Sequence, residues 1–402
     1  MESKPLYIVG IGLNSAIGLN AEETRLSLRN SRSGINRMTL LASEHNDLPV
    51  GEVPLTNEAL RRRLHIPDDE AITRSALLGI MAVHEALQSA GVSPKEVPMA
   101  FVNGTTVGGM DCSEQYYLDF LDNDSRNEYI ALHDVGGCTQ QIASHTGPFV
   151  CQASTSTACS SAANAIIHAA RLLECGEAEM AVAGGTECLT KFHLNGFNSL
   201  LILDSAPCRP FCNTRAGLNL GEGAAYVVLE TPEAARRRGH RPLAILRGYG
   251  NACDAFHQTA TSEEANGPYL AMRKALEKGQ LSPQDIDYIN AHGTATPDND
   301  RSELTAMHRL FGETLPPFSS TKAFTGHTTS ASGSIEAAIC VLAIRDGFIP
   351  ANLNWQEAID AKSIPVRTLQ TNCQLRHVLC NSFGFGGNDS SLLISAKEEE
   401  EC

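Results

Sequence analysis

The sequence predicts an α/β protein built from two similar halves. Strand-like apolar runs, such as the opening "LYIVGIG", alternate with helical patterns along the chain, which is typical of α/β architecture. Residues 85–105 and residues 274–294 align without a gap and share Ala-Leu, Ser-Pro and Gly-Thr pairs. We interpret this match as an internal duplication, with one half over residues 1–247 and the other over residues 248–402.

The predicted elements follow in the same order in both halves. In the first half, "ALLGIMAVHEALQSAG" predicts an amphipathic helix that ends at a glycine, and "VPMAFVNGT" predicts a strand that runs into a loop. The helix-like run after Cys159 ends at Gly176, and a similar run after Ser330 ends at Gly347. Residues 41–70 fit neither repeat, so we expect a polar surface insertion there.

Composition and charge exclude several classes of protein. The 402 residues carry a formal net charge of −15, which argues against nucleic acid or an anionic membrane as the main partner. The 13 cysteines are scattered without a C-x-x-C pair or a Cys/His metal spacing, so we expect free thiols and no metal site. The opening residues do not resemble a signal peptide, and no apolar run reaches membrane-spanning length. We therefore expect a cytoplasmic protein without a membrane span.

Cys159 is the candidate nucleophile. It stands in "STSTACSSAANAI", where a loop of small hydroxyl residues turns into an Ala-rich helix. Free N–H groups and the helix dipole at such a position favour a thiolate, so we expect a lowered pKa for this thiol. Small neighbours would also let a substrate approach the sulfur closely. The alternative for this stretch alone is an inert cysteine buried in a helix of small residues.

Two loops of the second half supply candidate histidines. His292 follows a predicted strand in "NAHGTATPDNDRSE", and Glu303 lies in the helix that can begin at Pro297. Lys322 and His327 lie in "SSTKAFTGHTTSASGSIEAA", just before another Ala-rich helix. Taken alone, each of these residues also suits an ordinary loop position.

A glycine-rich stretch near the C-terminus could shape a mobile loop. In "NSFGFGGNDSS", Gly384 and Gly386 flank Phe385, and glycine permits backbone conformations that other residues avoid. Such a loop can direct a backbone N–H at an oxyanion or move as a gate. A nucleotide site is not expected, because the chain has neither G-x-G-x-x-G nor G-x-x-x-x-G-K-[ST].

Together these stretches resemble the β-ketoacyl synthases, the condensing enzymes of fatty acid and polyketide assembly. "TACSS", "HGTATPDND", "TKAFTGHT" and "NSFGFGG" match the four signature segments of that family in order, and the resemblance covers nearly the whole chain. It implies a thiolase-like fold, in which two duplicated α/β halves form a five-layer αβαβα sandwich. It also implies an acyltransferase that condenses an acyl-enzyme with malonyl-acyl carrier protein, with no cofactor of its own.

The resemblance assigns a role to each candidate catalytic residue. Cys159 would take the acyl group from a carrier-protein thioester. His292 and His327 would stabilise the enolate that forms as CO2 leaves malonyl-acyl carrier protein. Lys322 and Glu303 would hold the histidine tautomers and the local charge balance.

The resemblance also implies an oxyanion hole and an acyl pocket. Backbone N–H groups of the nucleophile and of Phe385 would bind the oxyanion, with Gly384 and Gly386 on either side of this gating residue. Val107 and Phe197 would line the acyl pocket near the subunit interface.

Two kinds of protein partner follow from the resemblance. The first is an acyl carrier protein, which is generally acidic, so an acidic chain needs a local basic patch to dock it. The candidate docking residues are Arg61, Arg62, Arg63 and Arg74. The second partner is another subunit, paired through a strand expected near residues 150–156. That subunit is either an identical copy or a chain-length-factor-like protein.

The chain departs from the family pattern in two places. Asn388-Asp389 stands where Thr-Asn usually follows the gating loop, which puts the hydrogen bonding of the gate in doubt. Ala216 and Leu218 replace the usual Asp and Phe of an Arg-Asp-Gly-Phe segment, and Leu218 would loosen one packing position. These variants look closer to the ketosynthases of aryl-polyene and flexirubin pigment pathways than to housekeeping fatty acid enzymes.

The sequence argues against three other functions related to that of a β-ketoacyl synthase. A thiolase needs a second catalytic cysteine in the C-terminal glycine-rich loop, but that loop holds Phe383 and Phe385, and Cys380 lies earlier in a predicted strand. A chain-initiating synthase would have asparagine in place of His327. A non-catalytic chain-length factor would lack the nucleophile that Cys159 supplies.

Overall fold

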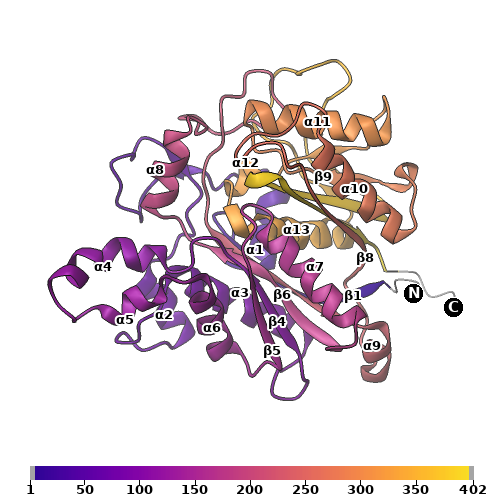
Figure 1. The fold of residues 1–402 in the computed structure, drawn as a ribbon. Coiled ribbons are helices and arrows are strands. Elements are labelled where there is room, and N and C mark those ends of the chain that lie inside the picture. The colour runs from indigo at the N-terminus through magenta and orange to yellow at the C-terminus, as the bar shows by residue number, and fades with distance from the viewer. Residues whose placement is uncertain (1–4, 398–402) are drawn as a thin grey trace.

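A computed structural model describes residues 5–397, and its largest sheet is a mixed sheet of ten strands (Figure 1). Two further sheets have two strands each: β2 (Asn36–Arg37) with β3 (Pro49–Val50), and β11 (Phe348–Ile349) with β12 (Gln370–Thr371). The strands of the main sheet are β1 (Leu6–Ser15), β4 (Ala100–Gly104), β5 (Cys151–Thr155), β6 (Met180–Glu187), β7 (Gly223–Glu230), β8 (Ala244–Cys253), β9 (Tyr288–Asn290), β10 (Phe318–Ser319), β13 (His377–Gly384) and β14 (Asn388–Ser395).

The main sheet consists of two five-stranded parts with the same topology. From the centre outward, the order is β1-β7-β6-β4-β5 in the N-terminal part and β8-β14-β13-β9-β10 in the C-terminal part. In each part the two inner pairings are antiparallel and the two outer pairings are parallel. A short antiparallel pairing of β1 with β8 joins the two parts. The duplication predicted from the sequence is therefore confirmed in the topology, while the boundary near residue 247 falls within β8 and stays a prediction.

The two parts of the main sheet form two layers, and helices form the other three: one layer between the two parts and one on the outer face of each part. The central layer holds α7 (Ser161–Glu174) and α13 (Ser332–Asp346), which pack with strands of both parts into one apolar core. The outer face of the N-terminal part is covered by α3 (Arg74–Ala90) and α6 (Val135–Thr146). The outer face of the C-terminal part is covered by α10 (Asn266–Gly279) and α11 (Pro297–Phe311). The expected αβαβα sandwich is confirmed.

Successive strand residues alternate between these layers, as the two-residue period of a strand requires. Along β13, Val378 and Cys380 face the central core, and Leu379 faces the outer core of α10 and α11. Both faces of the sheet are covered, which explains why the strands read as continuous apolar runs in the sequence. Helices outside the five layers are α1 (Ala21–Arg29), α2 (Asn57–Leu64), α4 (Met110–Asp122), α5 (Asn127–Ile130), α8 (Lys191–Ser199), α9 (Pro232–Arg238) and α12 (Lys322–Thr325).

The two central helices touch where they begin. A Cβ atom added to Gly333 would lie 2.8 Å from the backbone nitrogen of Ala163, so the first turns of α13 and α7 approach closely only because both residues are small. The residues of α13 are buried from Ser332 through Ala343, on every face of the helix. This contact brings the loop before α7 next to the loop before α13.

The segment 41–70 is less superficial than the sequence predicts. Leu60 of α2 is fully buried and belongs to the apolar core of α3 and α6, together with Val53 and Ile66. The expectation of a purely polar surface insertion is therefore wrong, because the few apolar residues of this segment anchor it to α3. Among the described residues, the helices are all too short or too polar to cross a membrane.

Candidate active site

Cys159 lies in a strained turn just before α7. Ala158 has a φ of 51°, in the left-handed region that non-glycine residues rarely occupy. Two hydroxyl-mediated hydrogen bonds hold the turn: Ser161 Oγ donates to the carbonyl of Ala158 at 2.6 Å, and the backbone N–H of Thr157 donates to Ser161 Oγ at 2.9 Å. The small hydroxyl residues around Cys159 therefore fix the backbone that presents its sulfur.

The Cys159 thiol is not acidic in this site. Burial raises the pKa of the thiol to about 11, although the charge of Lys322 and the backbone N–H groups of Phe385 and of Cys159 itself act in the opposite direction. The prediction of a lowered pKa is wrong, because the loss of water around a 6% exposed residue outweighs the effect of the helix start. The resting site holds a thiol, which must lose its proton when it reacts.

A carboxylate fixes the backbone of His292 after β9. Glu303 accepts hydrogen bonds from the backbone N–H of His292 at 2.9 Å and of Gly293 at 2.8 Å, and Asn381 donates a third at 3.0 Å. Gly293 is required here, because a Cβ atom would lie 2.6 Å from the Cβ of Ser320. The prediction that Glu303 holds a histidine tautomer is wrong, since its hydrogen bonds reach the main chain of this loop and not the imidazole.

His327 is fastened to the opposite half of the molecule. Its backbone N–H donates to the carbonyl of Asn219 at 2.7 Å, and its carbonyl accepts from the N–H of Gly221 at 3.0 Å. Its Nδ1 lies 3.0 Å from Ser332 Oγ at the start of α13. A Cβ atom on Gly221 would lie 2.3 Å from the carbonyl oxygen of Thr325, so glycine allows the two halves to meet at this point.

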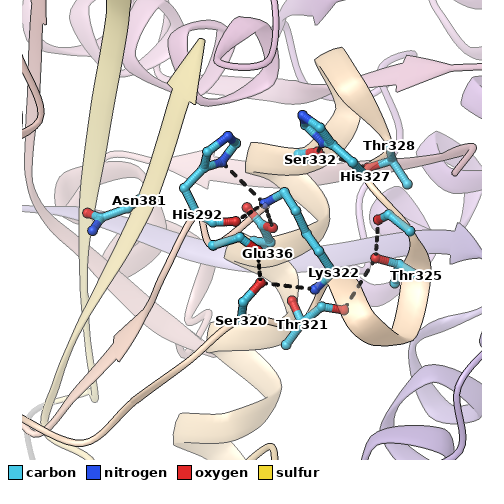
Figure 2. Close-up of polar contacts among 12 residues, drawn as sticks. His292, Ser320, Thr321, Lys322, Thr325, His327, Thr328, Ser332, Glu336 and Asn381 are labelled. Atoms are coloured by element: carbon cyan, nitrogen blue, oxygen red, sulfur yellow. Dashed lines mark hydrogen bonds and ion pairs between the residues drawn. The ribbon is translucent and has the colours of Figure 1, made fainter. Parts of the chain in front are cut away.

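Lys322 connects His292 to a buried acid, as Figure 2 shows. Its Nζ lies 3.2 Å from His292 Nδ1, donates to the His292 carbonyl at 2.6 Å and forms an ion pair with Glu336 at 2.5 Å. An ammonium group can only donate hydrogen bonds, so His292 Nδ1 is the acceptor and its Nε2 carries the proton. The ring of His292 thus has an N–H left to donate on its other side.

Both imidazoles are neutral. Burial lowers the pKa of His292 well below its usual value, and the positive charge of Lys322 acts in the same direction. Burial and the charges of Lys322 and His193 do the same for His327. The two rings lie nearly perpendicular, with centroids 5.4 Å apart. They form a pair of uncharged hydrogen-bonding groups beside a buried cation.

One cavity of about 420 Å³ unites these residues. Cys159, His292 and His327 line it, and so do Phe385 and Phe197. The rings of Phe385 and Phe197 stack with centroids 5.8 Å apart. The size suits part of an extended acyl or thioester substrate. The structure thus brings together the predicted nucleophile, both histidines and the gating residue.

The turn that carries Phe385 has the backbone freedom expected of a gate. Gly386 and Gly387 have φ values of 81° and 74°, and no atom lies within 4 Å of a Cβ added to Gly386. Gly384 ends β13 and lines the cavity, as does Gly386. Leu218, which departs from the family pattern, also lines the cavity and is buried among apolar neighbours.

Val107 does not line this cavity. It is 5% exposed and its backbone N–H lies 3.4 Å from a carboxylate oxygen of Glu187. Glu187 also accepts hydrogen bonds from Thr106 and, across the two halves, from Ser330. Of the two predicted acyl-pocket residues, only Phe197 belongs to the described cavity, so a place for Val107 in the acyl pocket stays a prediction.

Two of the four candidate docking arginines are buried. Arg74 forms a bidentate ion pair with Glu222, with N···O distances of 2.6 and 2.9 Å, and Arg61 donates to the carbonyls of Pro67 and Glu70. The prediction that these two dock a carrier protein is wrong, because their guanidinium groups are already used inside the protein. The exposed pair Arg62 and Arg63 remains available at the end of α2.

Glu336 is the main site residue that the sequence analysis missed. Burial raises its pKa to about 7, while Lys322 acts to lower it. It is the only charged residue of the stretch "SGSIEAAICVLAI", and a lone charge among small and apolar residues indicates a buried partner. This lone charge could have identified Glu336, which lies 14 residues after Lys322, as a residue of the site.

Comparisons with known proteins agree with this fold and site. The family model "Beta-ketoacyl synthase, N-terminal domain" matches residues 3–235, and "Beta-ketoacyl synthase, C-terminal domain" matches residues 243–356. The 3-oxoacyl-[acyl-carrier-protein] synthase 2 of Vibrio harveyi is 31% identical, over 98% of this chain and 99% of the relative. Nodulation protein E of Rhizobium meliloti (strain 1021) is 34% identical, over 96% of this chain and 98% of the relative.

Solved structures show the same architecture. The ishigamide ketosynthase/chain length factor has a TM-score of 0.91 and 28% identity, over 98% of this chain and 100% of that chain. The ketosynthase ApeO in complex with its chain length factor ApeC from Xenorhabdus doucetiae has a TM-score of 0.83 and 29% identity, over 98% of each chain.

Five layers with a cysteine and two histidines around one cavity define an acyltransferase of the thiolase-like superfamily. Within that superfamily, the chain belongs to the β-ketoacyl synthase family, and it is of the same class as the 3-oxoacyl-acyl-carrier-protein synthases.

Proposed function

We propose that this protein forms carbon–carbon bonds by decarboxylative Claisen condensation, with Cys159 carrying the acyl chain. The observation that carries the proposal is the single cavity in which the Cys159 sulfur of one half lies with the neutral His292 and His327 of the other. Lys322 and Glu336 hold His292 in its proton-donating form, and Glu303 holds the main chain of the same loop.

The first step is acyl transfer to Cys159. The sulfur attacks the carbonyl carbon of an acyl-carrier thioester, a new C–S bond forms, and the carrier's C–S bond breaks. The thiol proton passes to the leaving carrier sulfur. We assign the binding of the oxyanion in this step to the backbone N–H groups of Phe385 and Cys159, because both act on the sulfur.

The second step joins two carbon units. The bond between the malonyl carboxylate and the α-carbon breaks, CO2 leaves, and the electron pair forms an enolate on the thioester. His292 and His327 donate hydrogen bonds to the enolate oxygen, which stabilises the charge as it develops. The α-carbon then attacks the acyl carbonyl, the C–S bond to Cys159 breaks, and the thiolate takes one proton from water to return to its thiol form.

The cavity argues against the rival functions. A thiolase needs a second cysteine beside the first, but Cys380 lies in β13 and is absent from the cavity lining, where Phe383 and Phe385 stand instead. A non-catalytic chain-length factor needs neither a nucleophile nor histidines, and this chain keeps Cys159, His292 and His327. Condensation is the function that uses Cys159, His292 and His327 together.

Intact-mass measurement tests the proposal directly. Incubation with acyl carrier proteins loaded with chains of different length should add the mass of one acyl group to the wild-type chain. Cys159→Ala should remain at its unmodified mass and should release no β-ketoacyl product. Cys380→Ala is the matched control and should load normally. Acyl-enzyme in the Cys159→Ala variant would refute Cys159 as the nucleophile.

A polyene-type acyl chain is the substrate class that we propose. The supporting observation is the pair of stacked rings of Phe197 and Phe385 in the cavity, which offer a flat wall to a conjugated chain. Phe197→Ala should lengthen the product distribution, as read by mass spectrometry of the carrier-bound products. An unchanged distribution would remove Phe197 from the acyl pocket.

Docking of a carrier protein and pairing with a second subunit complete the proposal. One structural relative holds an acyl-carrier protein and another a chain length factor. In this chain, β5 is an edge strand with exposed residues, and Val150 just before it is 60% exposed. An obligate interface there would bury more than about 2,000 Å². A fully active monomer in light scattering would contradict the pairing.

A further inference from the structure

Two carboxyl groups, one buried and one half-buried, lie beside the turn that carries Phe385. Asp389 is the second residue of β14, immediately after that turn, and Asp254 follows β8. The backbone N–H of Asp254 donates to the carbonyl of Gly387 at 2.8 Å, so its segment is hydrogen-bonded to the turn. Asp389 is 2% exposed and lines the same cavity as Cys159. Neither carboxyl group has a role in the condensation chemistry proposed above.

The two carboxyl groups differ in how many donors they face. Asp254 accepts three hydrogen bonds, from the N–H and Oγ of Ser262, both at 2.7 Å, and from the N–H of Gly267 at 3.0 Å. Asp389 receives the backbone N–H of Gly384, while its Oδ2 has no hydrogen-bond partner among the described residues. The oxygens of Asp254 are thus occupied by donors, whereas Asp389 keeps one bare buried oxygen, which disfavours its charged form.

The surroundings of Asp389 favour its neutral form. Burial, the largest cause, and the neighbouring charges of Asp254 and of Glu303 on α11 together raise its pKa to about 9. These are the charged groups that face it from the elements packed against it, and both repel a negative charge. On its other side, a Cβ atom on Gly267 of α10 would lie 2.0 Å from Asp389 Oδ2, so the carboxyl group cannot move deeper.

We propose that Asp389 is a positioning residue whose protonated carboxyl group keeps the Phe385 turn closed over Cys159. The inference rests on the proposed function, because it assigns the turn a gating role. An ionised Asp389 would lie between Asp254, Glu303 and α10, and the cavity that it lines offers it a route outward to water. That movement would carry the beginning of β14 and the adjoining turn with it, and would expose Cys159.

The rate of Cys159 alkylation tests the inference without any condensation step. Iodoacetamide, which is uncharged, is applied between pH 7.5 and pH 10, and the modified Cys159 peptide is quantified by mass spectrometry. The rate for wild type is divided by the rate for Asp389→Asn at each pH, so the common titration of the thiol cancels. The ratio should rise about tenfold from pH 8 to pH 10, because the ionised fraction of a group with a pKa near 9 rises by that factor.

Two further variants make the outcome decisive. Asp389→Ser also cannot ionise and should give the same pH profile as Asp389→Asn. Asp122→Asn, a one-charge change at the exposed end of α4, should keep the wild-type profile. A ratio that stays flat with pH, or that changes equally in Asp122→Asn, would overturn the inference. Loss of acyl loading with the alkylation profile intact would instead count against the proposed function.

Thermal unfolding provides a second readout. A folded-state pKa near 9 lies above the unfolded value of about 3.9, so unfolding releases a proton between these pH values and stability falls as pH rises. The unfolding temperature of wild type should therefore fall relative to that of Asp389→Asn from pH 5 to pH 8. If the difference in unfolding temperature between wild type and Asp389→Asn stays constant with pH, Asp389 is ionised in the folded protein and the inference is overturned.

Discussion

The two halves place different chemistry at equivalent points of the same topology. In the N-terminal half, β4 contains Asn103, whose side chain is hydrogen-bonded to Thr139 and Tyr226, and the proposed nucleophile Cys159 stands just before α7. In the C-terminal half, β9 is followed by His292, and His327 lies in the loop before α13. Duplication thus supplied the geometry twice, and the residue types divided the roles between nucleophile and oxyanion donors.

The division of roles between the halves requires buried charges, and these lie mainly in the C-terminal half. The start of α7 carries no charged group, whereas α13 buries Glu336 against Lys322. A buried ion pair stabilises a fold weakly, because desolvation of both charges offsets their attraction. The pair is therefore explained by the proton that it fixes on His292, and separate tests of stability and activity can distinguish the two effects.

The largest effect is expected from breaking that ion pair. Lys322→Met should lower the free energy of unfolding by about 3–5 kcal/mol, because it leaves Glu336 buried without a partner. The double variant Lys322→Met/Glu336→Gln should recover most of this loss in chemical denaturation, yet should stay inactive. Recovery of condensation in the double variant would show that the pair serves stability alone.

Removing either imidazole should separate the two chemical steps. His292→Ala or His327→Ala should slow malonyl decarboxylation by roughly 10²–10³-fold, as for one lost oxyanion donor. The acyl-enzyme on Cys159 should still form in both variants, with intact mass as the measurement. A decarboxylation rate equal to that of wild type would break the division of roles between the halves.

The contact between the two central helices can be tested with one methyl group. Gly333→Ala places a Cβ atom 2.8 Å from the backbone of Ala163, and such overpacking should cost about 1–3 kcal/mol and lower kcat. Gly137→Ala in α6 is the matched control, because its nearest neighbour lies at an ordinary 3.6 Å. Equal stability and kcat in both variants would show that the helix starts tolerate separation.

The smallest effect concerns the surface of the N-terminal half. Reversing the charge of Arg62 and Arg63 should raise KM for the carrier-bound substrate several-fold and leave the alkylation of Cys159 unchanged, because exposed charges act mainly on encounter. Lys362→Glu, on the surface of the C-terminal half, is the control. An unchanged KM would remove this patch as a docking surface.

The sequence by itself determined the duplication, the α/β class and the identity of the central reactive groups. The repeat at residues 85–105 and 274–294 can be recognised in short stretches of sequence. The same is true of the small residues around Cys159 and His327, which allow the helices that follow to pack closely. The resemblance of four short segments to one family then linked residues that lie far apart in the chain. These features depend on residue type and spacing, which a sequence displays directly.

The tertiary structure alone decided the charge states and the partners of the site. Burial from both halves raises the pKa of Cys159, lowers that of His292 and makes Asp389 a neutral acid, contrary to what a helix start or a free carboxyl group suggests. Likewise, the burial of Arg74 depends on Glu222, which lies 148 positions away in the chain. Desolvation and ion pairing act through space, so distant segments set them and no local pattern reveals them.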